Sequence, residues 1–383
     1  MPQPSALIPM CRKPISVAEN SRHMPLPKTM RAVVYRGKGD LRLETVPLPS
    51  IRSGDLLVRV AACGVCPTDI KKIQYGTVPP PRIFGHETAG TIVKTGALVR
   101  NLYVGDRVAL HHHVPCQKCH FCRHKAFAQC TTYKRTGITA GFEPAGGGFA
   151  EYVRVMPFVL AGVVKIPRRN DFVEGAMLEP INTVLKAVRQ LSLLGNDTVL
   201  VVGQGPIGLM FTRLLTLAGM QVIATDLIPE RRSLGRRFGA WRVLNAADPD
   251  LSEQLHRATR GRGLDASILT VAADAPLRQA QTALRGGGTL QLFAHTVRGQ
   301  TTALDLSQVC VDEKPLLGSY SADVTLQSTV ARLVFSRQFD VRPLITHEFG
   351  LEQTAAAIEL AAHPTPDSLK IIVSAGTATG PIA

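Results

Sequence analysis

The sequence predicts an α/β protein in which a β-rich part is followed by a doubly wound parallel-sheet domain. Three observations predict this fold class. Residues 31–154 contain short β-branched runs separated by Gly and Pro, which is typical of antiparallel strands. From about Ile181 apolar strands alternate with segments of helical period, which is typical of a parallel sheet covered by helices. A glycine-rich turn at residues 203–208 joins the first of those strands to the first helix.

The β-rich part is predicted to be an irregular antiparallel barrel. It begins near Met30, because residues 30–35 open the first β-forming segment of the chain. Runs of β-branched and apolar residues then recur between turn residues. The predicted strands include residues 56–60, 90–93 and 106–110.

The second part alternates strands with helices. Residues 198–202 form a short apolar run that predicts a buried strand, and residues 206–218 repeat apolar positions with a helical period. This alternation continues along the chain and predicts a doubly wound parallel sheet. The remaining predicted elements are a strand at 221–225, a helix at 230–238 and strands at 266–269 and 289–293.

The composition is that of a soluble globular protein. The chain has 383 residues, of which 45% are hydrophobic and 19% charged, and it is long enough for two domains. No apolar run approaches the roughly 20 residues that span a bilayer, so we expect no membrane association. The formal net charge of +15 makes nucleic-acid binding an alternative. We favour a generally basic surface and no nucleic-acid partner, because the basic residues are scattered and only 5% of the residues are aromatic.

Residues 1–29 are predicted to be a disordered extension that precedes the fold. They are rich in Pro, carry no periodic apolar pattern and contain more Lys and Arg than Glu. A transit peptide is one alternative, and a start assigned too early is another. Nothing in this segment resembles a secretory signal peptide, so we expect a reducing, cytoplasmic environment.

Four cysteines follow the pattern C-x2-C-x2-C-x7-C within fifteen residues. This spacing brings four thiolates around one tetrahedral Zn²⁺. Disulfides are the alternative use of the four cysteines, and a reducing compartment favours the metal. Four cysteine ligands leave no open position for a substrate, so the site is predicted to be structural. Its ligands are Cys116, Cys119, Cys122 and Cys130.

The glycine-rich turn predicts a dinucleotide site. Gly203, Gly205 and Gly208 form the motif G-x-G-x-x-G between a strand and a helix, and Asp226 follows about twenty residues later. The first glycine permits the tight turn, the second lets the backbone approach the pyrophosphate, and the third lets helix and strand pack closely. The residues expected to hold the cofactor here are Gly203, Gly205, Pro206, Ile207 and Gly208.

Asp226, at the end of the second strand, predicts NAD rather than NADP. Its carboxylate can accept hydrogen bonds from the adenosine ribose hydroxyls, and it would repel a 2′-phosphate. Arg231 and Arg232 on the following helix oppose this prediction, because guanidinium groups suit phosphate. They are either solvated helix residues or cofactor contacts, and we keep Arg231 among the expected cofactor residues.

Three further motifs carry a family resemblance when they are taken with the cysteine pattern and the dinucleotide motif. They are Cys66-Pro67-Thr68-Asp69, Gly85-His86-Glu87 and Leu178-Glu179-Pro180. In motif order and spacing, the chain from about Met30 to about Val373 resembles the zinc-dependent medium-chain alcohol and polyol dehydrogenases, in the branch of sorbitol and threonine dehydrogenases.

The resemblance implies a particular domain order. A chaperonin-10-like catalytic domain would cover residues 30–180 and return at residues 321–383. A Rossmann domain would occupy residues 181–320 between these two segments. The family also implies a homodimer or a homotetramer.

The resemblance further implies a catalytic zinc site in addition to the structural one. Cys66 and His86 match the family's ligands, and Glu87 or Glu179 would complete the zinc shell directly or through water. Asp69 would orient His86 through its second ring nitrogen. Cys63 forms C-x-x-C with Cys66, but the family pattern makes it only a neighbouring strand residue.

Other positions are assigned by the resemblance alone. Thr68 would hydrogen-bond the substrate oxygen and pass its proton outward, and Lys71 stands where many relatives continue that relay with a histidine. One of His112 and His113 would line the substrate cleft. The two further expected cofactor contacts are Thr183 and, near the pyrophosphate, Lys370.

Together these observations predict NAD-dependent oxidation of a secondary alcohol, with a polyol or a hydroxy-amino acid preferred and two zinc ions per chain. One alternative is an NADPH-linked aldehyde or ketone reductase of the same fold, which Asp226 argues against. A more distant alternative is a zinc-dependent nucleic-acid-binding module. The complete dinucleotide motif and the separate pair of Cys66 and His86 argue against that alternative.

Overall fold

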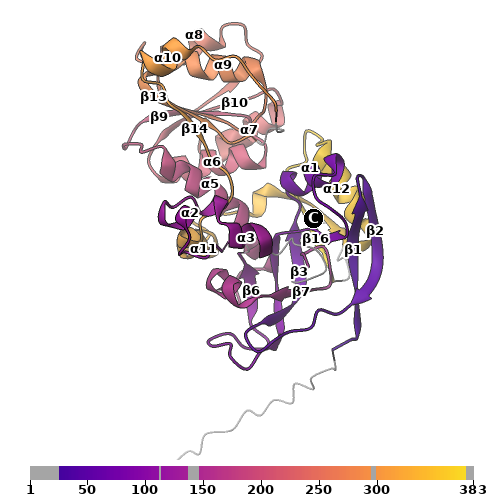
Figure 1. Cartoon of the computed structure of the whole chain (residues 1–383). Coiled ribbons are helices and arrows are strands. Elements are labelled where there is room, and N and C mark those ends of the chain that lie inside the picture. The colour runs from indigo at the N-terminus through magenta and orange to yellow at the C-terminus, as the bar shows by residue number, and fades with distance from the viewer. Residues whose placement is uncertain (1–25, 112–113, 137–145, 295–298, 377–383) are drawn as a thin grey trace, which may run out of the picture.

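The computed structural model of the protein describes residues 26–111, 114–136, 146–294 and 299–376. The N-terminal strands (indigo) and the C-terminal segment (yellow) lie together in one half of the molecule, whereas the middle of the chain (pink to orange) forms the other half (Figure 1). One half is β-rich and mainly antiparallel, and the other contains a parallel sheet with helices. The predicted fold class is therefore confirmed.

A seven-stranded sheet forms the centre of the β-rich half. Its strand order is β15-β16-β3-β5-β6-β8, and β7 pairs with β3. The predicted strands at 56–60, 90–93 and 106–110 are confirmed as parts of β3, β5 and β6. The strands are β3 (Leu56–Gly64), β5 (Glu87–Thr95), β6 (Arg107–Leu110), β7 (Tyr152–Val155), β8 (Val164–Lys165), β15 (Ile345–Gly350) and β16 (Lys370–Ser374).

The chain returns to this sheet after it has built the second half. β15 and β16 pair in parallel, unlike the antiparallel neighbours that the sequence pattern predicts. The parallel pairing is possible because α12 (Thr354–Ala362) forms the crossover between the two strands. β16 then pairs antiparallel with β3, so the last strand of the chain lies beside one of its first. The domain boundaries at residues 180 and 320 stay predictions.

A smaller sheet completes the β-rich half. β1 (Thr29–Gly37) pairs on one edge with β2 (Asp40–Pro47) and on the other with β4 (Arg82–Ile83). Met30 and Val34 face a small buried cluster, which agrees with a fold that begins near residue 30.

A six-stranded parallel sheet forms the second half, in the order β11-β10-β9-β12-β13-β14. Every residue of β9 and β12 is buried, as expected for central strands covered on both faces. The strands are β9 (Thr198–Val202), β10 (Gln221–Asp226), β11 (Arg242–Asn245), β12 (Leu264–Leu269), β13 (Leu284–Leu292) and β14 (Leu316–Gly318). The helices between them are α6 (Pro206–Leu217), α7 (Pro229–Arg237), α8 (Leu251–Ala258), α9 (Asp274–Thr282) and α10 (Leu306–Cys310).

A continuous apolar core joins the two halves. It extends from Ala62 and Ala89 on the β-rich sheet, through Ile181, to Val199 and Leu209 in the second half. No helix in the described ranges is long and apolar enough to cross a bilayer. The remaining helices are α1 (Pro67–Tyr75), α2 (His120–Arg123), α3 (Thr131–Thr136), α4 (Phe172–Ala176), α5 (Leu178–Gln190) and α11 (Gln327–Phe335).

The β-rich half contains a buried ion pair whose loss should destabilise the fold. Arg154 Nε lies 2.9 Å from Asp55 Oδ2, and both side chains are buried. Removing one partner leaves a buried charge without its counter-ion, so we expect Asp55→Ala to lower the free energy of unfolding by about 3–5 kcal/mol. Chemical denaturation measures this change. The exposed pair of Asp40 and Arg42 supplies the control, because Asp40→Ala should leave the denaturation midpoint nearly unchanged.

Candidate active site

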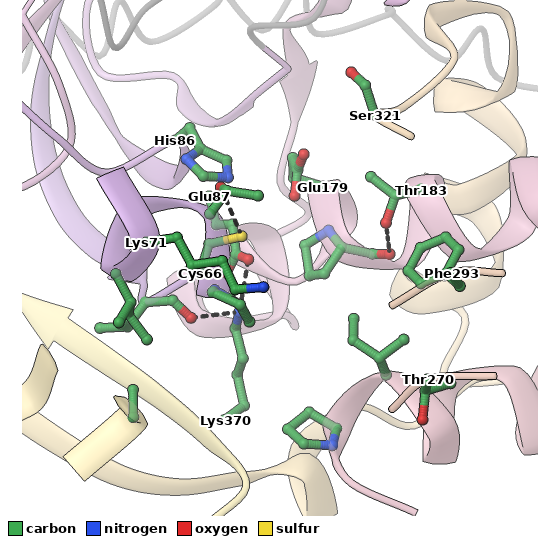
Figure 2. A pocket seen from close by; sticks show the side chains of 18 of the residues that line it. Cys66, Lys71, His86, Glu87, Glu179, Thr183, Thr270, Phe293, Ser321 and Lys370 are labelled. Atoms are coloured by element: carbon green, nitrogen blue, oxygen red, sulfur yellow. Dashed lines mark hydrogen bonds and ion pairs between the residues drawn. The ribbon is translucent and has the colours of Figure 1, made fainter. Parts of the chain in front are cut away.

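A cavity of about 880 Å³ lies between the two halves. Its walls combine α1, β5 and β16 with α5 and α6. Ligands of doubly wound proteins bind in the crevice beyond the carboxyl ends of the parallel strands, and this cavity reaches Thr270, directly after β12. The expected site residues on its wall are Cys66, Thr68, His86, Glu87, Glu179, Thr183, Pro206, Ile207, Arg231 and Lys370. Figure 2 labels Cys66, His86, Glu87, Glu179, Thr183 and Lys370 among them.

Cys66, His86 and Glu87 bring their ligand atoms within 4.8 Å of one another. Cys66 is the residue directly before α1, and Glu87 is the first residue of β5. The starts of these two elements therefore lie close together. A thiolate, an imidazole and a carboxylate form a normal donor set for Zn²⁺, and three protein ligands leave the open position that a catalytic site needs. These residues fit a catalytic zinc ion.

Asp69 fixes the orientation of His86. Its carboxylate oxygens lie 3.2 Å and 3.1 Å from His86 Nδ1, and both side chains are buried. A hydrogen bond at Nδ1 leaves Nε2 for a metal ion. Burial acts to lower the pKa of His86, but Asp69 and Cys66 outweigh it and raise that pKa well above its ordinary value. Metal binding requires the neutral ring, so it competes with the proton at Nε2.

Thr68 lies beside the same group of ligands. Its Oγ1 donates a hydrogen bond to Cys66 Sγ over 3.2 Å, from the first turn of α1. A hydroxyl group both donates and accepts, and its proton rotates freely. Thr68 can therefore accept a proton from one neighbour while it donates to another.

Lys370 forms a buried ion pair with Glu87. Its Nζ donates to Glu87 Oε1 over 2.6 Å and to the carbonyl of Val65 over 2.9 Å. Burial raises the pKa of Glu87, against the opposing charge of Lys370. Burial would lower the pKa of Lys370, but the attraction of Glu87 raises it. The role of Lys370 as a pyrophosphate contact stays a prediction, and here its ammonium group is engaged with Glu87.

Glu179 and Thr183 project from the first turns of α5. Glu179 is buried, and its charge is one cause of the raised pKa of Glu87. Among the described residues, however, the three-ligand group does not include Glu179. Thr183 Oγ1 donates to the carbonyl of Pro180 over 2.7 Å and faces the cavity (Figure 2).

The glycine-rich turn has room for a ligand at one position. Gly203 has φ +89°, a conformation that L side chains rarely adopt. A Cβ atom at Gly208 would collide with the carbonyl oxygen of Gly203, so this contact between helix and strand requires glycine. A Cβ atom at Gly205 would meet nothing within 4 Å, and α6 begins at the next residue. An open space at a helix N-terminus suits the pyrophosphate of a dinucleotide.

Asp226 supports the glycine-rich turn from the end of β10. One carboxylate oxygen accepts from the backbone N–H of Gln204 at 2.6 Å, and the other accepts from that of Ile228 at 2.8 Å. Arg232 donates to the backbone carbonyls of Asp226 and Leu227. Sequence reasoning did not anticipate that Asp226 would hold the turn itself.

Arg231 connects the two halves at the cofactor end of the cavity. Its Nη2 donates to the carbonyl of Thr365 at 3.4 Å, across the cavity from α7. Its buried Nε has no hydrogen-bond partner among the described residues.

The four cysteines of the predicted structural site form a separate cluster. Their sulfur atoms all lie within 4.8 Å of one another, with Cys119 to Cys122 at 3.4 Å and Cys116 to Cys122 at 3.9 Å. Zn–S bonds of about 2.3 Å place the sulfurs of a tetrahedral site about 3.8 Å apart. The backbone N–H groups of Lys118 and Cys119 lower the pKa of Cys116 to about 6, which favours a thiolate. This cluster fits a zinc ion.

Some expected residues do not join the site. His112 and His113 lie outside the described residues. Cys63 belongs to neither ligand group in the part of the chain that the structure describes. Burial raises the pKa of Cys63 to about 12, so its thiol stays protonated.

Sequence reasoning missed three residues that shape the cavity. Tyr133 follows the cysteine cluster, and its hydroxyl lies 3.5 Å from Ser321 Oγ on the cavity wall. Its only sequence signal was its position three residues after Cys130. Gly64 ends β3, and a Cβ atom there would overlap the Glu87 carboxylate. No sequence signal indicates that Gly64 makes room for the pair of Glu87 and Lys370.

Known proteins share this arrangement. The alcohol dehydrogenase GroES-like domain matches residues 52–168, and the zinc-binding dehydrogenase domain matches residues 206–336. Sorbitol dehydrogenase of Macaca fascicularis is 30% identical over 347 residues, which cover 87% of this chain and 92% of that protein. The chain belongs to the zinc-dependent medium-chain alcohol and polyol dehydrogenases.

Other members of this family are similar over nearly the whole chain. Sorbitol dehydrogenase of Bacillus subtilis (strain 168) is 29% identical over 355 residues, which cover 91% of this chain and 98% of that enzyme. The crystal structure of 2R,3R-butanediol dehydrogenase from Bacillus subtilis has a TM-score of 0.79 at 25% identity, and covers 91% of this chain and 100% of that one. This medium-chain dehydrogenase is thus a zinc-dependent oxidoreductase of alcohols or polyols that uses a nicotinamide cofactor.

The two ligand groups predict two zinc ions per chain. Cys122→Ser should remove one ion and lower the thermal midpoint strongly, because structural zinc contributes about 10–16 kcal/mol of apparent binding energy in small zinc peptides. Cys66→Ser should remove the other ion and leave a folded protein that binds the dinucleotide. Elemental analysis and thermal denaturation measure both effects. The exposed Cys310 supplies the control, because Cys310→Ser should keep both ions.

Proposed function

We propose that the chain oxidises a secondary alcohol, of the polyol or hydroxy-amino acid class, with NAD as hydride acceptor. The observation that carries this proposal is the position of the three-ligand group, which shares one cavity with the glycine-rich turn. A substrate hydroxyl beside Cys66 and His86 would then face the nicotinamide end of a bound dinucleotide. The sorbitol dehydrogenases among the relatives support a polyol.

In this proposal Cys66, His86 and Glu87 hold the catalytic zinc. Bound there, Zn²⁺ supplies the Lewis acidity that lowers the pKa of the substrate hydroxyl. The choice of Glu87 over Glu179 rests on the 4.8 Å ligand group, which contains Glu87. Asp69 keeps the His86 ring in its ligand orientation, and Lys370 balances the charge of the buried Glu87 carboxylate.

Thr68 removes the hydroxyl proton in the proposed reaction. Its Oγ1 lies 3.2 Å from Cys66 Sγ, so a substrate oxygen that approaches the ligand group comes within reach of the hydroxyl. Thr68 accepts the substrate proton and donates its own toward the cavity mouth. When bound, the nicotinamide accepts the hydride. The chain contributes alignment of these groups inside the cavity.

NAD is the proposed cofactor because Asp226 stands at the tip of β10. A carboxylate there repels a 2′-phosphate and can bind the bare ribose diol. Arg231 supports the alternative of an NADPH-linked reductase, because its guanidinium group faces the same end of the cavity. Asp226 is the closer of the two groups to the glycine-rich turn, since it accepts a hydrogen bond from Gln204 within that turn.

The remaining proposals concern the whole molecule. We propose two zinc ions per chain, an assembly of two or four identical subunits, and a cytoplasmic location. The domain boundaries proposed at residues 180 and 320 fall at the start of α5 and after β14.

A substrate screen tests the proposed function. The purified protein is incubated with sorbitol, xylitol, L-threonine, butane-2,3-diol and simple alcohols, and NADH formation is followed by absorbance. We expect turnover with at least one polyol or hydroxy-amino acid. Aldehyde or ketone reduction with NADPH, in the absence of any alcohol oxidation with NAD, would establish the alternative.

Substitution of Thr68 tests the proton step. We expect Thr68→Ala to lower kcat by about 10²–10⁴-fold, the usual contribution of a positioned proton-transfer group. The affinity for NADH, measured by fluorescence titration, should stay nearly constant because Thr68 contacts the substrate oxygen. Thr68→Ser keeps the hydroxyl and should retain most of the activity. Equal losses in Thr68→Ser and Thr68→Ala would contradict a proton-transfer role.

The cofactor preference is tested at Asp226. We expect the wild type to favour NAD by at least about tenfold in kcat/KM, which corresponds to roughly 1.4 kcal/mol. Asp226→Asn removes the charge, keeps one of the two acceptor oxygens that hold the turn, and should reduce that preference. Arg231→Ala should increase it, because it removes the group that suits a phosphate. Equal use of NADP by the wild type would show that Arg231 controls this end of the cavity.

A further inference from the structure

One face of α1 carries a basic pair next to the proposed proton acceptor. Thr68, Lys71 and Lys72 are spaced i, i+3 and i+4 in this helix, so their side chains share one face about one turn apart. All three line the cavity. The opposite face of the helix packs into the protein through Ile70 and Ile73, which are buried. The helix therefore presents two ammonium groups to the same space as Thr68.

The lysines are partly withdrawn from solvent. Lys71 extends into the cavity beside Cys66 (Figure 2), and burial lowers its pKa. A partly desolvated ammonium group gains from an anion that binds next to it. Family relatives that relay a proton from this position carry a histidine there, and a lysine has a much higher ordinary pKa than a histidine.

Positive charge exceeds negative charge on the described wall of the cavity. Five lining residues are lysines or arginines and two are carboxylates, and of these carboxylates only Glu87 belongs to the three-ligand group. Arg82, from β4, and Arg231, from α7, also line the cavity, and Arg231 donates to the carbonyl of Thr365. The cationic residues are Lys71, Lys72, Arg82, Arg231 and Lys370, and the carboxylates are Glu87 and Glu179.

We propose that the substrate is an anionic alcohol whose carboxylate or phosphate group is bound by Lys71 and Lys72, with Arg82 adding to the positive field. This inference rests on the proposed function, because the hydroxyl that reacts is the one beside Thr68. Since one helical turn separates Thr68 from the lysines, the anionic group lies a few bonds from the carbon that is oxidised. A sugar acid and a phosphorylated polyol share this chemistry.

The competing explanation is that the lysines serve the cofactor. In that case their loss would weaken the binding of NAD and lower the turnover of all substrates alike. The two explanations therefore predict changes in different kinetic constants. Substrate binding changes kcat/KM for the anionic alcohol alone, and cofactor binding changes KM for NAD.

The experiment compares three six-carbon substrates that differ in charge: sorbitol, sorbitol 6-phosphate and gluconate. With the full-length, zinc-loaded protein and NAD, we expect one anionic member to exceed sorbitol by at least about tenfold in kcat/KM. A larger value for the phosphate identifies a phosphorylated polyol, and a larger value for gluconate identifies a sugar acid. The preference should weaken as ionic strength rises, because salt screens the attraction that draws the charged substrate through solvent toward the cavity.

Variants then assign the preference to α1. The double substitution Lys71→Met and Lys72→Met should lower kcat/KM for the preferred anion by at least about tenfold more than for sorbitol. The corresponding double substitution to Arg keeps both charges and should retain the preference. Lys94→Met, on the exposed side of β5, is the matched control and should behave as wild type. Fluorescence titration of the NADH complex with each anion measures binding without turnover.

The outcomes distinguish failure of the anionic-substrate proposal from failure of the proposed function. Oxidation of sorbitol without any advantage for either anion overturns the anionic substrate and leaves the proposed function intact. Absence of oxidation for all three substrates and for the general alcohol panel overturns both. An equal loss for sorbitol and the anion, with a raised KM for NAD, assigns the lysines to the cofactor. If the double Met variant does not fold, the salt dependence and the Arg variant decide.

Discussion

The candidate active site depends on the buried ion pair between Glu87 and Lys370. The two residues are 283 positions apart in the chain, and their contact requires β16 to return beside β3. A buried carboxylate without a counter-ion would be protonated or displaced, and it would then be a poor metal ligand. Gly64 makes the contact possible, because any larger residue would occupy the space of the carboxylate. The last strand, β16, thus supplies the positive charge of Lys370 that balances the Glu87 carboxylate on β5.

The same principle of distant support recurs at the dinucleotide turn. Asp226, at the end of β10, accepts hydrogen bonds from the backbone N–H groups of Gln204 and Ile228. Arg232 donates to the backbone carbonyl of Asp226 itself. A carboxylate that is already held in this way does not need to reorganise when a ligand arrives. In the proposed function, support of the turn and the choice between NAD and NADP are therefore combined in one side chain.

Much of this arrangement is predictable from sequence because it depends on residues that are close together in the chain. Cysteine spacing, the glycine motif and alternation of apolar runs each act over fewer than about thirty residues, and each led to the right element. The partner of Lys370 was not predictable, since its contact with Glu87 depends on the register of β16. Tyr133 was missed for a similar reason. Its neighbour Ser321 is 188 positions away in the chain, and only the tertiary fold brings the two hydroxyl groups together.

The position of Tyr133 in the cavity wall has a consequence for how substitutions can alter this enzyme. The cavity wall that it forms comes from the cysteine cluster, whereas the ligand group comes from α1 and β5. A change in the cluster segment can therefore alter which molecules enter without moving Cys66, His86 or Glu87. The wall around Tyr133 is thus encoded on a different stretch of the chain from the ligand group, whereas Lys71 and Lys72 share α1 with Thr68.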